Sequence, residues 1–254
     1  MLRAADIGVA FGALRAVDGI DLVVDEGEAV GMVGPNGSGK STFLNAITGV
    51  VRAEGALSVG GRPVPLGRPP AIRRAGVART FQTPQTFAEL TCIENVLLAD
   101  GERRATGLVG AWLGRPAMWR HERARWERAA AALDRVGLAD RAEDEAGLLS
   151  YGQQRLLELA RSLVGEPRVL LADEPSAGLN AAETGELAAL LGRLHRDGVS
   201  LLVVDHKIDF IESIATRVVV LQLGRVIAEG PPAEVWQHAE VVDAYLGRAR
   251  TAEA

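Results

Sequence analysis

Short runs of apolar, often β-branched residues alternate along this chain with longer amphipathic segments. The apolar runs end at Gly, Asp or another polar residue, which is typical of strands buried on both faces. These runs predict strands at Ile20–Val24, Ala29–Val33, Val169–Ala172, Ser200–Val204 and Arg217–Leu223. The amphipathic segments predict helices at Lys40–Gly49, Ile93–Ala99, Glu122–Val136, Gly152–Val164, Ala181–His195 and Lys207–Ala215. Strands that alternate with helices favour an α/β fold with a mostly parallel sheet.

The strand pattern disappears in the middle of the chain. No strand is predicted between Gln82 and about Gly165, where the helical pattern continues. We therefore expect a helical subdomain, 82–165, inserted into an α/β core made of 1–81 and 166–254. The segment Pro63–Pro70 predicts a stiff loop, because proline fixes φ and lacks an N–H donor. The tail Arg248–Ala254 is expected to be frayed.

Composition narrows the class of protein. The 254 residues carry a net charge of -5, which argues against a nucleic-acid-binding protein, since such domains are usually basic. The single cysteine, Cys92, excludes an internal disulfide framework and fits a reducing compartment. No apolar run reaches the ~18–20 residues that a membrane helix needs, and the first residues lack a signal-peptide pattern. We expect a cytosolic protein unless a partner holds it at a membrane.

The strongest local motif is GPNGSGKST, which matches G-x-x-x-x-G-K-[ST] between a predicted strand and a predicted helix. Its glycines let backbone N–H groups turn toward phosphates, and the following helix favours an anion at its start. Lys40 would supply a cation for the β- and γ-phosphates, and Ser41 a hydroxyl ligand for Mg²⁺. An ordinary glycine-rich turn is the alternative. The candidate nucleotide-binding residues of this loop are Gly34, Asn36, Gly37, Ser38, Gly39, Lys40, Ser41 and Thr42.

Two further apolar runs end at polar residues with candidate chemistry. Asp173 and Glu174 follow the run VLLA, and His206 follows SLLVVD. Ligands bind at the carboxyl ends of the strands in such sheets. We expect Asp173 to bind Mg²⁺, Glu174 to accept a proton from the attacking water, and His206 to hydrogen-bond the γ-phosphate or that water. The alternatives are an exposed pair of strand-end charges and a structural histidine.

Several motifs occur together in one order. They are GPNGSGKST, FQ at Phe81–Gln82, LSYGQQR at Leu149–Arg155, VLLADEP, SAGLN at Ser176–Asn180 and DH at Asp205–His206. With this set, the chain resembles the ATP-binding subunits of ABC transporters over essentially its whole length. The resemblance implies one ATP-binding domain, 1–254, with a P-loop NTPase cassette fold in which an antiparallel β part and a helical insertion join the parallel core. It also implies an ATPase that uses ATP and Mg²⁺.

The resemblance assigns roles to residues outside the phosphate loop. It implies that Phe11 stacks on adenine, and that Gln82 touches Mg²⁺ and relays the nucleotide state to a membrane subunit. Ser150, Gly152 and Gln153 would contact the γ-phosphate of ATP bound by the opposite subunit. Ser150 is also expected to cap the helix that follows it. The expected metal-binding residues are then Ser41, Gln82 and Asp173, and the expected catalytic residues are Lys40, Gln82, Glu174 and His206.

Four positions depart from the family pattern. Tyr151 stands at the second glycine of the common signature LSGGQ, and Asn180 replaces the usual aspartate. Asp205 and Lys207 flank the histidine where Glu and Asp are commoner. Gly152 is retained where the backbone must approach a phosphate closely, so we expect the activity to survive.

Longer segments resemble the ATPases of branched-chain amino acid importers. They include ARTFQTPQTFAELTCIENVLLA, LSYGQQRLLELARSL, EPSAGLN and VVDAYLG. The resemblance implies a second ABC ATPase subunit, identical or paralogous, with which the chain binds two MgATP at a shared interface. It further implies two transmembrane permease subunits and, indirectly, a periplasmic or extracellular substrate-binding protein, but no nucleic acid. The chain would then lie at the cytoplasmic face of the inner or plasma membrane, peripheral through the permease subunits.

Other functions stay open at this point. A sibling ATPase of the same architecture would import urea or short amides or export a lipid. A soluble ABC ATPase acting on nucleic acid or ribosomes would usually carry two cassettes or basic faces, unlike this acidic chain with one cassette. A nucleotide-regulated scaffold without hydrolysis would lack Glu174 or His206, and both are present.

Two segments are candidates for contacts with other molecules. The insert from Thr106 to about Arg125 is amphipathic, so it either packs its own apolar side as a helix pair or contacts a membrane subunit or lipid headgroups. Its apolar residues are Leu108, Trp112, Leu113 and Trp119. Thr83–Ala88, directly after Gln82, is the candidate floor of a groove for a permease helix, with Phe87 as its apolar anchor.

Overall fold

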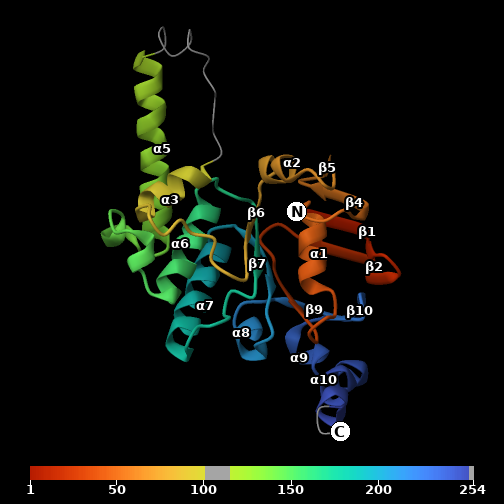
Figure 1. The fold of residues 1–254 in the computed structure, drawn as a ribbon. Helices are drawn as coiled ribbons and strands as arrows, with labels where there is room; N and C mark the ends of the chain where they lie inside the picture. The colour runs from red at the N-terminus through yellow and green to blue at the C-terminus, as the bar shows by residue number, and fades with distance from the viewer. Residues whose placement is uncertain (101–114, 252–254) are drawn as a thin grey trace. The chain divides into compact units, whose positions relative to one another are not determined.

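The computed structural model describes residues 1–100 and 115–251 (Figure 1). The chain divides into two compact units, which we call the core unit and the helical unit. The core unit comprises Met1–Gln82 and Arg168–Ala254, and the helical unit comprises Thr83–Pro167. The core unit contains two sheets together with helices, and the helical unit consists mainly of helices, so the predicted α/β fold is confirmed.

The larger sheet of the core unit is mostly parallel. It has six strands in the order β10-β9-β3-β8-β7-β6, and the β10–β9 pair is antiparallel. Every residue of β3, β7 and β8 is buried, which explains their unbroken apolar runs. The strands are β3 (Ala29–Val33), β6 (Val77–Thr80), β7 (Val169–Asp173), β8 (Ser200–Val204), β9 (Arg217–Gln222) and β10 (Arg225–Gly230).

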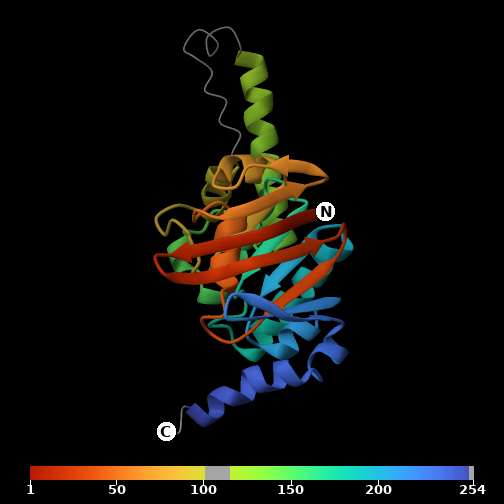
Figure 2. The same cartoon turned by 90° about the vertical axis from the view of Figure 1, so that its right-hand side faces the viewer.

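The smaller sheet of the core unit is antiparallel, with the order β2-β1-β4-β5, and β1 and β2 are the long red strands of Figure 2. Its strands are β1 (Leu2–Phe11), β2 (Leu14–Val24), β4 (Glu54–Val59) and β5 (Arg62–Val64). The sequence pattern did not predict β1, because its alternation of buried and exposed residues breaks in the middle. The pairing of β1 with β2 shifts between Ala4 and Ile7, where Asp6 has a φ of 51°. Such a bulge moves the apolar side chains out of a period of two.

Helix α1 (Lys40–Ile47) packs between the two sheets and contacts β1, β2 and β7. Phe43, Leu44 and Ile47 are fully buried in a hydrophobic cluster that includes residues of both sheets. Met32 of β3 belongs to this cluster, whereas an added Cβ on Gly31 would lie 2.5 Å from Ile211 Cγ2. Successive residues of a strand point to opposite faces, so helices cover the larger sheet on both sides.

The core unit has further helices, and two of them, α2 and α10, differ from what the sequence predicted. The helices are α2 (Pro69–Arg74), α7 (Ala181–Arg196), α8 (Ile208–Glu212), α9 (Pro232–Val235) and α10 (Ala239–Thr251). The predicted loop Pro63–Pro70 instead contains the last two residues of β5, Pro63 and Val64, and the start of α2 at Pro69, because proline is tolerated in the first helical turn. The predicted frayed tail is helical as far as Thr251.

The helical unit is built from α3 (Cys92–Ala99), α5 (Arg115–Arg135), the short 3-10 helices η1 (Ala139–Arg141) and η2 (Ala146–Leu148), and α6 (Tyr151–Leu163). Capping boxes begin both α3 and α6, which satisfies N–H groups that the first turn of a helix leaves free. Of the predicted amphipathic insert, 106–114 lies outside the described residues, and the part from Arg115 onward belongs to α5. Leu108, Trp112 and Leu113 are therefore not described, and neither is the side chain of Trp119.

Arg217, at the start of β9, joins several elements of the core unit. Its Nε and Nη2 donate to the two carboxylate oxygens of Glu28 at 2.7 and 2.9 Å, and it also pairs with Glu229. The Glu28 side chain is 17% exposed and that of Arg217 is 20% exposed. Burial is the largest influence on the pKa of Glu28 and raises it. The hydrogen bonds from Arg217 and from Asp25 N, together with the positive charge of Arg217, outweigh burial and lower that pKa below its ordinary value of 4.5.

We expect Arg217→Met to lower the free energy of unfolding by about 2 kcal/mol at pH 7, because it leaves a largely buried carboxylate without its partner. The Glu28 contribution is present above pH 4.5 and is lost as pH falls through the lowered folded value. Denaturant unfolding at pH 7 and pH 3.5 should therefore give a smaller difference between variant and parent at the lower pH. The pair Arg225–Asp18 provides the control, since the Arg225 side chain is 71% exposed and Arg225→Met should destabilise the protein much less than Arg217→Met. An equal loss at both pH values would contradict the assignment to Glu28.

Candidate functional site

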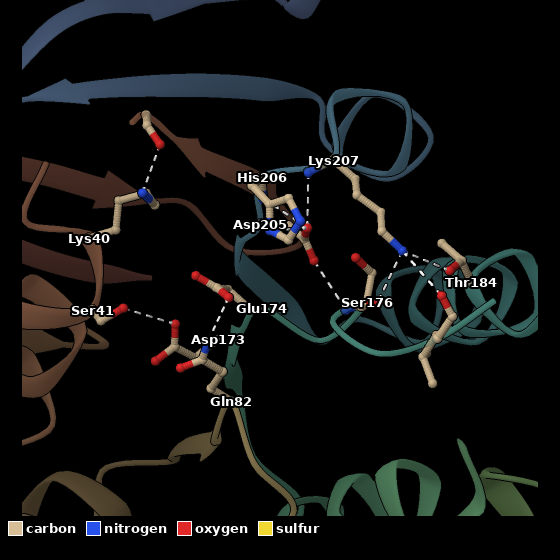
Figure 3. Close-up of polar contacts among 12 residues, drawn as sticks. Lys40, Ser41, Gln82, Asp173, Glu174, Ser176, Thr184, Asp205, His206 and Lys207 are labelled. Atoms are coloured by element: carbon tan, nitrogen blue, oxygen red, sulfur yellow. Dashed lines mark hydrogen bonds and ion pairs between the residues drawn. The ribbon is translucent and has the colours of Figure 1, made fainter. Parts of the chain in front are cut away.

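A cavity of about 450 Å³ opens in the core unit where several parallel strands end. The phosphate loop follows β3, Gln82 follows β6, Glu174 follows β7 and His206 follows β8, so the topology brings these segments to one edge of the sheet. Figure 3 shows the polar side chains that gather here. The cavity is lined by Asn36, Gly37, Gly39, Lys40, Ser41, Thr42, Gln82, Glu174 and His206.

The loop between β3 and α1 has a shape that only glycine allows at two positions. Gly34 has a φ of 147° and Gly39 a φ of 105°, and an added Cβ would lie 2.1 Å from Leu221 O and 2.6 Å from Ala16 O respectively. The first turn of α1 has no side-chain cap. The loop therefore directs backbone N–H groups and the positive end of a helix to the same place, which is the arrangement that binds phosphate.

Lys40, the first residue of α1, follows this loop directly and has only 6% of its surface exposed. Its Nζ donates to Gly34 O at 2.8 Å, to Pro35 O at 3.0 Å and to Ser38 Oγ at 3.4 Å. An ammonium group is a compact cation on a flexible stem. It can therefore hold the loop and meet the oxygens of a phosphate in the same cavity.

The oxygen atoms of Ser41 and Asp173 form the corner of the site that could hold a metal ion. Ser41 Oγ donates to Asp173 Oδ1 at 3.5 Å, and Asp173 is 3% exposed. Hard oxygen donors of this kind suit Mg²⁺, which is usually held by one or two protein groups together with phosphate and water. Within the described ranges, no group of three or more His, Cys, Asp or Glu residues could hold a metal ion by itself. The residues present therefore fit a magnesium ion that arrives with its phosphates.

Arg79, on β6, holds the other oxygen of the same carboxylate and was not predicted. Its Nη2 donates to Asp173 Oδ2 at 2.7 Å, and its Nη1 donates to Asn45 Oδ1 at 2.7 Å. Both side chains of the ion pair are at least nine-tenths buried, at 6% and 5% exposed. The pair fixes the orientation of Asp173 and leaves Oδ1 directed toward Ser41. The only signal in the sequence was a charged residue in a short segment that forms the strand next to β7. The sequence alone does not indicate that Arg79 pairs with Asp173.

Glu174 follows β7 in a left-handed conformation. Its φ is 43°, which costs about 1–2 kcal/mol for a residue other than glycine. Its N–H donates to Val204 O at 2.7 Å, and its Oε2 accepts a hydrogen bond from Gln82 Nε2 at 2.8 Å. This conformation places the carboxylate in the cavity wall, while the preceding residue, Asp173, faces the metal corner.

His206 reaches the cavity from a loop that Asp205 shapes. The Asp205 side chain is fully buried, and its Oδ1 accepts hydrogen bonds from the N–H groups of His206 at 2.8 Å and Lys207 at 3.0 Å. Its Oδ2 accepts a third from Ser176 N at 3.1 Å. The aspartate is short enough to bond its own following N–H groups, as in an Asx turn. The half-exposed imidazole of His206 lies in the cavity wall.

Several predicted residues of the core unit lie away from the cavity surface. Phe11 ends β1 with 53% of its surface exposed and is absent from the described cavity wall. Ser38 is 2% exposed and lines a separate cavity of about 210 Å³ with Asp243 and Ala244 of α10. The C-terminal helix thus packs behind the phosphate loop, which the sequence pattern did not predict. Burial at this place raises the pKa of Tyr245.

The signature residues lie in the helical unit. The Ser150 hydroxyl accepts from Gln153 N at 3.3 Å, and Gln153 Oε1 accepts from Ser150 N at 3.0 Å. The predicted cap of α6 is therefore confirmed, and Gly152 is in the first turn of the helix. The Tyr151 ring, 42% exposed, lies 5.6 Å from the guanidinium carbon of Arg155. The nucleotide contacts of these residues stay a prediction.

Comparisons with known proteins decide the family. A family model described as "ABC transporter" matches residues 17–177, and one described as "Branched-chain amino acid ATP-binding cassette transporter" matches residues 225–251. This chain belongs to the ABC transporter family. Over 251 residues it is 39% identical to the high-affinity branched-chain amino acid transport ATP-binding protein BraF of Pseudomonas aeruginosa, with 98% of each chain covered.

Solved structures of ABC cassettes agree with this assignment. A nucleotide-free ATP-binding cassette from an ABC transporter matches with a TM-score of 0.83 and 30% identity over 96% of this chain and 98% of that chain. A dimeric bacterial ABC transporter cassette matches with a TM-score of 0.75 and 26% identity over 91% of this chain and 99% of that chain. The resemblance seen in the sequence is confirmed, and the chain is a nucleotide-binding ATPase. Across the described residues, no helix has the length and apolar character needed to span a membrane.

Proposed function

We propose that this ABC ATPase is the ATP-hydrolysing subunit of a branched-chain amino acid importer. The observation that carries the proposal is its 39% identity, over 98% of both chains, to a branched-chain amino acid transport ATP-binding protein. The match of residues 225–251 to the branched-chain amino acid cassette model supports it independently of the common ABC motifs. We further propose that the core unit and the helical unit act as one ATP-binding domain, 1–254.

ATP binds, in this proposal, with its phosphates against the loop Gly34–Thr42. The Lys40 ammonium moves between the loop carbonyls and the β- and γ-phosphate oxygens, which replaces neutral acceptors by charged ones. Phe11 stacks on adenine from the end of β1. Ser41 and Asp173, with Gln82, would hold Mg²⁺, which would offset charge on the phosphates when bound. Arg79 keeps the Asp173 carboxylate in place for this contact.

Hydrolysis uses the two strand-end residues of the cavity wall. Glu174 accepts a proton from a water whose oxygen attacks the γ-phosphorus, and the bond from that phosphorus to the β-phosphate oxygen breaks to give ADP and phosphate. His206 hydrogen-bonds the water or the γ-phosphate and so fixes the line of attack. Gln82 donates to Glu174 and keeps its carboxylate directed into the cavity before the nucleotide arrives.

Two copies, or this chain and a relative, complete each site. Ser150, Gly152 and Gln153 of one subunit meet the γ-phosphate bound by the other, at the start of α6, where a helix favours an anion. The dimeric ABC cassette among the structural neighbours supports this arrangement. ATP then favours the closed dimer because it binds that state better, and hydrolysis removes the preference.

The remaining partners follow from the importer assignment. Two permease subunits hold the ATPase at the cytoplasmic face of the membrane, and a substrate-binding protein delivers the amino acid from outside. The test is to purify the ATPase with its permeases and binding protein, and to screen that binding protein against leucine, isoleucine, valine, urea and short amides. Leucine-class binding with substrate-stimulated ATP hydrolysis supports the proposal, and selective binding of urea or an amide contradicts it.

Phe87 gives a test of coupling to the permease. In the helical unit its backbone is held by the fully buried Asn95, which accepts from Phe87 N at 2.8 Å and donates to Phe87 O at 2.9 Å. The ring itself is 52% exposed, with the Arg161 guanidinium 5.5 Å from its centroid. The backbone of this segment is therefore fixed while its apolar side chain remains available for a partner.

We expect Phe87→Ala to reduce substrate transport in proteoliposomes about tenfold while basal ATP hydrolysis stays within about twofold, because an apolar anchor at an interface contributes more than 1 kcal/mol. Leu148→Ala is the matched control, since Leu148 is an exposed apolar residue of the same unit and should leave both rates unchanged. Loss of both transport and hydrolysis in Phe87→Ala would indicate that Phe87 supports the fold instead.

A further inference from the structure

The side chain of Lys207 bonds to the turn that follows Glu174. Its Nζ donates to Ser176 O at 3.1 Å, to Leu179 O at 3.4 Å and to Thr184 Oγ1 at 3.4 Å (Figure 3). Ser176 and Leu179 belong to the segment between β7 and α7, and Thr184 lies in the first turns of α7. One ammonium thus holds both ends of this segment from the loop that carries His206.

Asp205 provides a second bond between the same two segments. Its Oδ2 accepts from Ser176 N, while Oδ1 holds the backbone of His206 and Lys207. Ser176 is consequently held on both sides, through its N–H by Asp205 and through its C=O by Lys207. We call this set of bonds the 176–207 clasp.

The clasp acts on the turn that fixes the backbone of Glu174. Ala177 N donates to Glu174 O at 3.1 Å, so the turn begins at the glutamate itself. Glu174 has the left-handed φ of 43°, a conformation that a glutamate keeps only where its surroundings impose it. If the segment 176–180 were free to relax, Glu174 could return to an ordinary conformation and leave the cavity wall.

Lys207 has the right chemistry for its three acceptors. The ammonium carries three donors and no acceptor, whereas an arginine presents its donors in one plane. Lys207 and Lys40 are the only lysines in a sequence that otherwise uses arginine for its basic residues.

We infer that Lys207 is a positioning residue for ATP hydrolysis, which keeps Glu174 and His206 in their relative places through the 176–207 clasp. The inference rests on the proposed role of Glu174 as general base. The Lys207 ammonium is directed to the carbonyls of Ser176 and Leu179 and is not part of the cavity wall, so we expect it to act through the backbone of this segment. Its removal should therefore affect the chemical step more than nucleotide binding.

The test compares Lys207→Met, which keeps the length of the side chain but has no donor, with the parent protein. We expect kcat for ATP hydrolysis to fall about tenfold, because Glu174 would be correctly placed to accept the proton for a smaller fraction of the time. The Kd for a fluorescent ATP analogue should change less than about twofold. Hydrogen–deuterium exchange of the amides in 174–184 should increase. Glu212→Gln removes a charge from the exposed end of α8 and should leave all three measurements unchanged.

Thr184 provides a milder pair of variants that tests the same bond. Thr184→Val removes an acceptor of Lys207 and also the hydroxyl's own bond to Asn180 O at 2.7 Å, whereas Thr184→Ser keeps both, so kcat should fall in the first and recover in the second. In the double variant with Lys207→Met, the effect of the valine on kcat should be smaller than in the parent, because the bond between Lys207 and Thr184 is already absent. This pair decides the question if Lys207→Met does not fold.

Two results would overturn the inference. One is an unchanged kcat in Lys207→Met together with increased exchange in 174–184, since the clasp would then exist without serving hydrolysis. The other is a parallel loss of nucleotide affinity, kcat and melting temperature in both Lys207→Met and Thr184→Val, which indicates a role in stability only. Neither result concerns the proposed general base, which fails separately if Glu174→Gln keeps normal turnover.

Discussion

Glu174→Gln is expected to bind ATP with nearly unchanged affinity while its hydrolysis rate falls by about 10²–10⁴-fold. The amide keeps the shape of the side chain and can still accept the hydrogen bond from Gln82 Nε2, so the cavity wall is preserved. It cannot accept a proton from water, and a general base contributes about this factor to an enzymatic rate. With hydrolysis blocked, ATP should hold the closed dimer, which size-exclusion chromatography with light scattering would detect.

The matched control for this variant is Glu186→Gln, on an exposed position of α7. It removes the same charge from the same unit and should leave both turnover and oligomeric state as they are in the parent. Normal turnover in Glu174→Gln would remove Glu174 from the catalytic role, and another group of the cavity wall would have to accept the proton.

Lys40→Ala should act at an earlier step and weaken nucleotide binding itself by about 100-fold. Hydrogen bonds to charged groups contribute about 1.5–3 kcal/mol each, and the Lys40 ammonium is placed to meet two phosphates. The substitution also removes the donor that joins the carbonyls of Gly34 and Pro35, so the loop loses its internal support. An equilibrium titration with a fluorescent ATP analogue measures the effect directly.

Arg52→Ala serves as the control for the loss of positive charge. Arg52 is exposed in the segment that follows α1, so its removal changes the net charge equally without touching the loop. Its affinity for the analogue should match that of the parent. If Lys40→Ala bound the analogue as well as Arg52→Ala did, the phosphates would have to lie elsewhere.

The parallel sheet could be predicted from the sequence because its strands are buried on both faces. The predicted runs Ala29–Val33 and Ser200–Val204 coincide with β3 and β8 to the residue. The antiparallel strand β1 gives a weaker signal, because its bulge at Asp6 interrupts the alternation of buried and exposed positions. Helix α2 was missed for a different reason, since its first residues are the prolines that predicted a loop.

The sequence could predict those residues of the candidate site that directly follow strands. Lys40, Glu174 and His206 converge because their strands are neighbours in a parallel sheet, and this follows from topology. Arg79 and Lys207 were not assigned these contacts, because their partners are distant in the sequence. Arg79 binds a carboxylate 94 positions away, and Lys207 binds a backbone carbonyl 31 positions away. The pattern of side chains along the sequence does not indicate contacts of this kind.

Helix α1 joins chemistry and architecture in one element. Its first residues, Lys40 and Ser41, face the cavity, while Phe43 and Ile47 fill the interior that both sheets share. A ligand that binds at the start of this helix also stabilises the packing at its other end. Nucleotide binding and the stability of the core unit against unfolding are therefore linked. Substitutions deep in that shared interior should therefore be read for their effect on nucleotide affinity as well as on folding.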